Sequence, residues 1–481
     1  MGKNRGKSNS VFRTQISSFV IAGALGGTVA CAANGDLDSS FGANGLALSD
    51  SGNFQISGDA GTPTLVQPDG KILTCTSVVT GGSSGRDMYV ARFTASGHLD
   101  PDFSFDGHVT IDFDGGAGSD YCSALALQPD GKIVVVGTTS KNNSADFAVA
   151  RLKDDGTLDN MFGEAAGGGL RTGKTTIDFQ RGGGDSDSAT SVAIQKDGQI
   201  VVAGYAATAS GGRDFAVVRL NGDGSRDSSF TLTGKVTLGF NLPGSTSKDD
   251  VATSVKVDSA GRVVLGGSAN KIGGNNDFAI ARLLSTGLPD DDFDADGLAT
   301  VAFDLGGATG MNNDQAFAMT LLGDKIVLVG AADISALAQT SNYDVAVARL
   351  LPDGSPDGSF GTSGKTLLSF DLAANAIDQP FAVAAQSNGK LLVGGYALAG
   401  SASDAFVVRL NRDGSPDNEF GAQGKKLFDF ALHNPSQQAV TGVGLQGTQV
   451  IATGTVLLGT NLYRQFAIRM ENDLIHASEF D

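Results

Sequence analysis

The segment Phe147-Ala-Val-Ala-Arg-Leu152 decides the fold, because close variants of it return along the whole chain. Each copy places a short apolar run before an arginine, as expected for a buried β-strand. The copies are spaced by roughly 63 residues, which indicates a repeat protein. The arginines of the seven copies are Arg92, Arg151, Arg219, Arg282, Arg349, Arg409 and Arg469.

The copy between residues 122 and 179 shows the order of elements inside one repeat. Four short apolar stretches, 122–127, 132–137, 147–152 and 175–179, are separated by polar segments. The turn Gln128-Pro-Asp-Gly131 follows the first, since Pro fixes one φ angle and Gly permits a positive one. The second stretch is apolar on both faces, like a middle strand, and the fourth alternates, like an outer strand. We predict four antiparallel strands per repeat and no helices.

Seven such repeats predict an all-β protein, a seven-bladed β-propeller. A β-solenoid would need shorter repeats without the four-strand order. The last copy stops soon after Arg469, and residues 36–48 supply the fourth strand that it lacks. We predict that this N-terminal strand pairs with the last three strands and closes the ring, which removes free sheet edges.

The repeated signature joins Gln128-Pro-Asp-Gly-Lys132, the arginine segment, and Asp353-Gly-Ser-x-Asp-x-x-Phe-Gly361. It resembles the delta-60 repeat of bacterial proteins over nearly all of residues 34–481. The resemblance implies a propeller in an exported bacterial protein, and implies little about activity because that family has no general assigned function. Three copies depart from the pattern, which leaves their turn geometry open: Ser259-Ala-Gly261, Gly323-Asp-Lys325 and Gln446-Gly-Thr448.

Residues 1–33 are predicted to be a signal peptide, followed by a single propeller domain over 34–481. Basic residues precede an apolar stretch over 16–29, and Ala30-Cys-Ala32 offers a cleavage site. In the alternative, Thr28-Val-Ala-Cys31 is an imperfect lipobox with a lipidated Cys31. We therefore expect export to the periplasm or medium, or a lipid anchor at the envelope. The apolar run is short for an uncleaved anchor, and no later stretch predicts a membrane span.

The formal net charge of −18 and the absence of a basic run after the N-terminus argue against a nucleic-acid partner. We expect a monomer that binds an unknown protein or small ligand. Export would permit a disulfide between Cys75 and Cys122. Alternatively, the two thiols are buried as small apolar groups.

Two sets of acidic residues recur in the repeats. One precedes the first strand: Asp59, Asp120, Asp187, Asp250, Asp314 and Asp378, with Gln438 in the seventh copy. The other precedes the third strand: Asp87, Asp146, Asp214, Asp277, Asp344 and Asp404, with Arg464 in the seventh. Both should lie on one face, around the mouth of a channel, and could bind a cation or cationic ligand there. Repetition in every blade favours the alternative, in which each Asp accepts hydrogen bonds from its own turn.

The seven arginines are predicted to brace the blades through carboxylates, with the turns that carry Asp69, Asp130 and Asp197 as partners. Two other turns suggest calcium, because oxygen side chains alternate before a glycine. These predicted ligands are Asp292, Asp294 and Asp296 in blade four, and Asp102 and Asp106 in blade one. No bidentate Glu follows, and Ser229–Gly234 has the same register without acids, so a plain turn is the alternative.

Two functions remain open from the sequence. Uniform repeats, an export signal and the lack of a catalytic constellation favour a binding or scaffold propeller at the cell envelope. The alternative is a metal-dependent hydrolase or lactonase at the channel mouth, in which paired carboxylates hold the metal and act as base. Whether the protein is an enzyme is left open, and the binding role is preferred.

Overall fold

The computed structural model describes residues 33–49, 55–56, 63–79, 85–113, 115, 118–141, 144–181, 186–242, 249–271, 275–305, 312–335, 342–372, 377–433, 435–459 and 462–472. Residues from Ala33 onward form one compact unit. The first 32 residues, with Cys31, and Asp59 lie outside the described residues.

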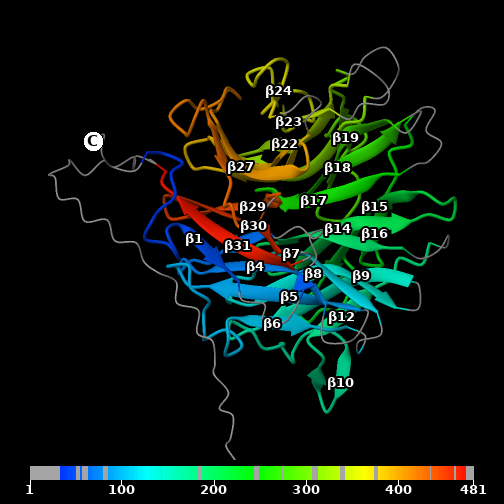
Figure 1. Cartoon of the computed structure of the whole chain (residues 1–481). Coiled ribbons are helices and arrows are strands. Elements are labelled where there is room, and N and C mark those ends of the chain that lie inside the picture. The colour runs from blue at the N-terminus through cyan, green and yellow to red at the C-terminus, as the bar shows by residue number, and fades with distance from the viewer. Residues whose placement is uncertain are drawn as a thin grey trace, which may run out of the picture. The chain divides into compact units, whose positions relative to one another are not determined.

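The described strands form seven antiparallel blades of four strands each, so the predicted fold is confirmed (Figure 1). Blades 1 to 4, from first to fourth strand, are β3 (Thr64–Val66), β4 (Ile72–Val79), β5 (Arg86–Phe93) and β6 (His108–Ile111); β7 (Ser119–Leu127), β8 (Ile133–Lys141), β9 (Ser144–Leu152) and β12 (Lys174–Ile177); β13 (Ser188–Ile194), β14 (Ile200–Ala207), β15 (Arg213–Leu220) and β16 (Lys235–Leu238); β17 (Val251–Val257), β18 (Val263–Lys271), β19 (Asn275–Leu283) and β20 (Leu298–Val301).

The remaining blades follow the same order. Blades 5 to 7 are β21 (Gln315–Leu322), β22 (Lys325–Asp333), β23 (Tyr343–Leu350) and β24 (Lys365–Leu368); β25 (Asp378–Ala385), β26 (Leu391–Ala399), β27 (Ala402–Leu410) and β28 (Lys425–Phe428); β29 (Gln438–Gln446), β30 (Gln449–Gly459), β31 (Leu462–Met470) and β1 (Leu46–Leu48). A short strand, β2 (Gln55–Ile56), pairs with both β31 and β4 and joins blades 7 and 1 in one sheet.

The ring closes at the N-terminal strand. Leu46 pairs with Ile468, and Leu48 pairs with Phe466, so β1 is the fourth strand of blade 7. The first strands of successive blades also contact one another in sequence, and β29 of blade 7 contacts β3 of blade 1.

The second strand of each blade is apolar on both faces because a neighbouring blade covers each face. In β8, Val134 and Val136 pack in a cluster that includes Val202 of blade 3. Val135 packs on the opposite face, in a cluster that includes Val90 of blade 1. Burial on both faces by sheet-to-sheet packing therefore produces the uniform apolar runs in the sequence.

A glycine in the second strand fits a bulge in the first. The register of β13 shifts between Ala189 and Ser191, where Gly204 of β14 lies opposite. A Cβ atom on Gly204 would lie 1.9 Å from the carbonyl oxygen of Ser188. The close approach of two backbones therefore requires glycine at this position.

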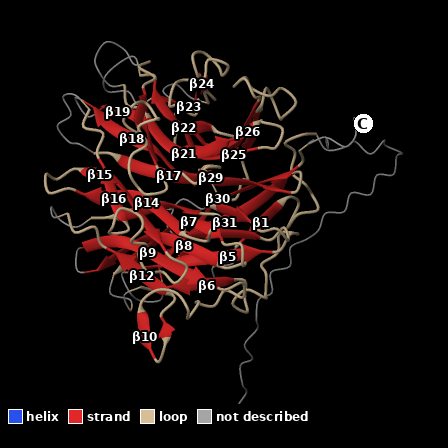
Figure 2. Cartoon of the chain, turned by 180° about the vertical axis from the view of Figure 1, so that it is seen from behind, coloured by secondary structure: helices blue, strands red, loops and turns tan. Residues whose placement is uncertain are grey.

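Blade 2 carries one element that the sequence did not predict. A hairpin of β10 (Ala165–Gly167) and β11 (Leu170–Arg171) interrupts the expected turn before β12, and it projects beyond its blade in Figure 1. Arg171 holds it to blade 3, since its Nη2 atom lies 2.7 Å from Asp223 Oδ2. The described residues contain strands and loops without helices (Figure 2), and hence no helix long and apolar enough to cross a membrane.

Cys75 of β4 and Cys122 of β7 form a disulfide between blades 1 and 2. Both side chains are buried. Of the two interpretations left open above, the structure therefore contains the bond.

Candidate functional site

The repeated arginines form ion pairs inside their own blades. Arg92 Nε donates to Asp100 Oδ2 at 2.7 Å, and its guanidinium lies 4.7 Å from the centre of the Phe103 ring. Both charged side chains are buried. The equivalent pairs are Arg151–Asp159, Arg219–Asp227, Arg282–Asp290, Arg349–Asp357, Arg409–Asp417 and Arg469–Asp38.

The same arginines also tie each blade to the next. Arg219 Nη1 donates to the carbonyl oxygen of Ser285 at 2.6 Å, and Arg469 Nη1 donates to that of Ala95 at 2.9 Å. Arg409 instead reaches the side-chain oxygen of Asn472. The predicted brace exists, but its acid follows the third strand. Asp69, which the sequence suggested as a partner, lies beside Lys71.

The first set of acids joins neighbouring blades at the opposite end of the third strands. Asp120 Oδ2 accepts a hydrogen bond from the backbone N–H of Phe113 at 2.7 Å, across the boundary between blades 1 and 2. Asp187, Asp250, Asp314 and Asp378 accept from Phe179, Phe240, Phe303 and Phe370 in the same way. Gln438 Oε1 takes the position in blade 7, 3.2 Å from Phe430 N. These side chains therefore bond the exit of the preceding blade, whereas the sequence suggested their own turns.

Several of these carboxyl groups are held in an unusual protonation range. Burial raises the pKa of Asp314 to about 7, and the nearby Asp277 adds to the shift. Burial likewise raises the pKa of Asp378 and of Asp344 to about 6. A buried carboxyl group favours its neutral form unless a cation compensates it.

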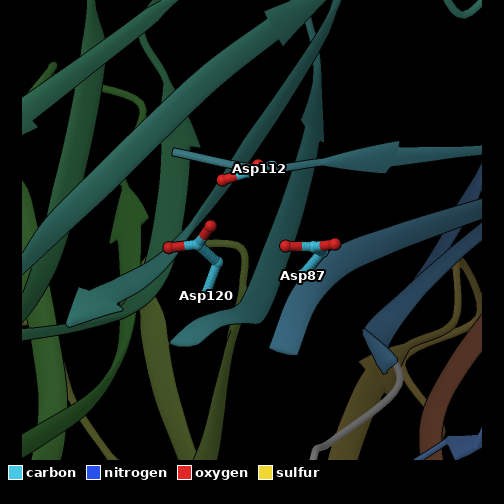
Figure 3. A group of neighbouring side chains, drawn as sticks. All are labelled: Asp87, Asp112 and Asp120. Atoms are coloured by element: carbon cyan, nitrogen blue, oxygen red, sulfur yellow. The ribbon is translucent and has the colours of Figure 1, made fainter. Parts of the chain in front are cut away.

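Acids of both sets meet at two blade junctions. Asp87 of β5, Asp112 after β6 and Asp120 of β7 place carboxylate oxygens within 4.8 Å of one another, as Figure 3 shows. Asp146, Asp178 and Asp187 repeat the arrangement between blades 2 and 3. We call these groups the two Asp triads. Each offers three oxygen ligands, the donor type that Ca²⁺ and Mg²⁺ prefer.

The next two junctions contain protein cations instead. Arg181 Nη1 lies 2.7 Å from Asp214 Oδ2, and Lys271 Nζ lies 3.1 Å from Asp277 Oδ2. Gly239 and Ala302 replace the acid that follows the fourth strand in the triads. The sequence analysis missed Asp112 and Asp178 because each triad combines residues from two consecutive repeats.

The turns predicted to bind calcium are organised differently. Asp296 Oδ1 accepts from the Leu298 N–H at 2.9 Å, and the backbone N–H of Asp294 donates to Asp353 O at 3.0 Å. Burial raises the pKa of Asp294, and Asp296 adds to the shift. Among the described residues, the three-acid groups close enough to share an ion are the two triads, so calcium at Asp292, Asp294 and Asp296 stays a prediction.

The corresponding turn of blade 1 also has local bonds. Asp106 Oδ1 accepts from the His108 N–H at 3.2 Å, and the backbone N–H of Asp102 donates to Asp100 Oδ1 at 3.2 Å. Calcium at this turn likewise stays a prediction.

Two turns before the fourth strand expose large apolar side chains. Phe105 of blade 1 is 95% exposed and Leu232 of blade 3 is 90% exposed. Their φ angles are +72° and +62°, a conformation that side-chain-bearing residues rarely adopt. The sequence signal was an apolar residue inside an otherwise polar turn.

Six segments of the chain match a family model described as "Domain of unknown function (DUF5122) beta-propeller", over residues 67–103, 128–162, 195–230, 261–293, 324–360 and 386–420. The chain carries β-propeller repeats. Each DUF5122 match begins in or near the first turn of a blade and, in five of the six, ends at or just beyond the phenylalanine under the arginine. No protein of curated function matches the sequence significantly.

Three solved structures illustrate the similarity in fold. A protein of unknown function from Dyadobacter fermentans is 11% identical, with a TM-score of 0.44, over 73% of this chain and 94% of that chain. The polysaccharide lyase Uly1 is 10% identical, with a TM-score of 0.41, over 86% and 90%. A Trypanosoma rangeli sialidase mutant displaying trans-sialidase activity is 10% identical, with a TM-score of 0.39, over 90% and 59%. TM-scores this low carry no argument about activity.

Proposed function

We propose that this chain is an exported scaffold propeller of the delta-60 kind that binds a protein partner through the outer turns of blades 1 to 3. The observation that carries the proposal is the exposure of Phe105 and Leu232 at positive φ. Backbone strain of this kind costs about 1–3 kcal/mol per residue and clusters at functional sites.

The three turns follow one another along one rim of the ring. Ser104 N donates to Asp155 O of blade 2 at 2.9 Å, and Gly163 N donates to Asp223 O of blade 3 at 2.9 Å. Between them lies the β10–β11 hairpin, in which Leu170 is exposed. Met161 beside it is exposed as well. Exposed apolar groups gathered in one region mark interaction surfaces.

The polar residues that recur in every blade support a scaffold. The arginines and the first set of acids form bonds within and between blades. The Cys75–Cys122 disulfide supports an exported location, since such bonds persist in oxidising compartments. The net charge of −18 favours solubility after export.

Cross-linking of the exported protein to envelope extracts tests the binding role. We expect a defined cross-linked species with the wild type that the double variant Phe105→Ser/Leu232→Ser loses. Ala295→Ser is the matched control, because Ala295 occupies the same turn position in blade 4 at a φ of +69°. Equal cross-linking by all three proteins would contradict the assignment of this rim.

A second function, cation-dependent hydrolysis, is favoured by the two Asp triads. We propose them as the sites of the calcium suggested by the sequence. In this function the triads would hold the ion, and a carboxylate would accept a proton from water. A panel of esters and lactones with added Ca²⁺ tests it. Turnover that Asp112→Asn and Asp178→Asn each reduce supports the hydrolase, and no turnover on the panel rejects it.

A further inference from the structure

A groove of about 470 Å³ lies between blades 5 and 6, at the end of the blades that carries the arginine braces. It lies between the first turns of the two blades, and Lys325, Arg349, Arg412 and Asp413 provide its charged lining. Its volume falls within the range of about 300–1,000 Å³ that is common for small-molecule sites.

The lining charge of this groove differs from that of its counterpart. The groove between blades 3 and 4 has the same volume, about 470 Å³, and balances Lys196 and Arg219 against two acids, Asp197 and Asp258. Between blades 5 and 6 three cations face one lining acid. In a chain with a net charge of −18, this groove is locally cationic.

Arg412 carries the uncompensated charge. Arg349 Nε and Lys325 Nζ share Asp357 Oδ2, each at 2.7 Å. Among the described residues, no acidic side chain forms an ion pair with Arg412. A guanidinium offers planar paired donors that match a carboxylate or phosphate group.

The position of Arg412 is fixed by the first turn of blade 6. Its Nε atom donates to the carbonyl oxygen of Asn388. The side chain packs on Gly389, where an added Cβ would lie 2.7 Å from Nε. With Nε bound, the two terminal nitrogens are available to a ligand.

Blade 5 also lacks a bridge that crosses other junctions. Gln128 Nε2 donates to Gly198 O, and Gln195 Nε2 donates to Gly261 O, both at 3.3 Å across a blade boundary. Leu322 stands at this position in blade 5, where a two-residue turn joins it to Lys325. An apolar side chain cannot donate, so no equivalent bridge crosses this groove.

We propose that the groove between blades 5 and 6 binds a small polar molecule that carries a carboxylate or phosphate group. Arg412 is the bidentate donor, Lys325 adds a second positive charge, and Leu322 contacts the uncharged part. The inference does not depend on the proposed partner rim, which lies on other blades.

Calorimetric titration with three hexoses tests the proposal: D-glucuronate, D-glucose 6-phosphate and uncharged D-glucose. We expect at least one of the two anions to bind and glucose not to bind. The anion that binds identifies the group recognised. Arg412→Ala should weaken that binding roughly tenfold or more, because hydrogen bonds to a charged group are lost.

Two further variants separate recognition from a change in folding. Lys196→Ala, in the matching groove, should bind as the wild type does. Arg412→Lys keeps the charge without the planar donor pair and should bind with intermediate affinity. The proposal is overturned if neither anion binds at millimolar concentration, if glucose binds equally well, or if Arg412→Ala retains wild-type affinity.

Discussion

Arg469 Nε donates to Asp38 Oδ2 at 2.7 Å, which joins the last blade to the N-terminal segment across 431 positions in the sequence. Burial alone would raise the pKa of Asp38, but hydrogen bonds from Ser40 and Gln449 and the charge of Arg469 lower it to about 2. The other six blades contain the same pair within one continuous stretch of chain.

Arg469→Met should therefore have two effects. Loss of one partner of a largely buried pair costs about 3–5 kcal/mol in the free energy of unfolding. Residues 34–49 should also become sensitive to protease, because β1 loses a side-chain tie to blade 7. Urea unfolding and limited proteolysis measure the two. Arg282→Met, within blade 4, is the control and should change stability alone. Unaltered cleavage of the Arg469 variant would refute the closing role.

Reduction of the Cys75–Cys122 disulfide should destabilise the protein. The bond closes a loop of 47 positions, and the loop-closure model gives it about 4 kcal/mol. Unfolding by urea with and without reductant measures the difference. The double variant Cys75→Ala/Cys122→Ala should be insensitive to reductant. Equal stability of the reduced and oxidised wild type would show that the bond contributes little.

Stability should fall as the pH rises from 5 to 8. A carboxyl group whose folded pKa is raised stabilises the fold fully below its unfolded pKa and loses that contribution as the pH passes its folded pKa. For Asp314 these values are 3.8 and about 7, and burial is the main cause. Asp344 and Asp378, with a pKa of about 6 each, act in the same direction.

Asp314→Asn should flatten this pH dependence. Its amide oxygen can still accept from Phe303 N, as Gln438 does for Phe430 in blade 7. Urea midpoints measured at several pH values, with Asp69→Asn as an exposed control, test the expectation. A wild-type midpoint that rises toward pH 8 would contradict it.

Gly204→Ala should destabilise blade 3 by about 1–3 kcal/mol, the usual cost of overpacking. Its Cβ would meet the carbonyl oxygen of Ser188 at 1.9 Å. Gly222→Ala is the matched control in the same blade, because an added Cβ there has nothing within 4 Å. Thermal unfolding compares the two variants, and equal melting temperatures would reject the close-approach argument.

Calcium should raise the melting temperature if the triads bind it. A ligand bound only by the folded state adds about 2.7 kcal/mol at a hundredfold excess over its Kd. We expect the rise to disappear in Asp112→Asn/Asp178→Asn and to persist in Asp294→Ala. Loss of the rise in Asp294→Ala alone would place the ion in the blade 4 turn instead. No difference between calcium and EDTA would make all these acids architectural.

The fold followed from the sequence because the repeat imposes the same physical demand seven times. The apolar run before Arg151 predicts a strand covered on both sides, and the adjacent Pro-Asp-Gly predicts its hairpin. The closing strand was predictable because Leu46–Leu48 repeats the alternation of the other fourth strands. The β10–β11 hairpin was not, since Gly-rich residues at 166–169 indicate a turn without indicating its pairing.

The site was only partly predictable. The acids of both sets were identified, but the meeting of Asp87 with Asp120 depends on the packing of consecutive blades, which no single repeat encodes. The arginine partner was misassigned although a signal existed. From Arg92–Asp100 to Arg409–Asp417, the acid follows the arginine by eight positions.

The pairing of β1 with β31 sets an order on the making of the molecule. During synthesis β1 emerges first among the described strands, and its partner emerges last. Blades 1 to 6 can form while the chain elongates, but the seventh must wait for Leu462–Met470. Until then β1 remains without its neighbour, so a chain halted late in translation carries six blades and an open seam.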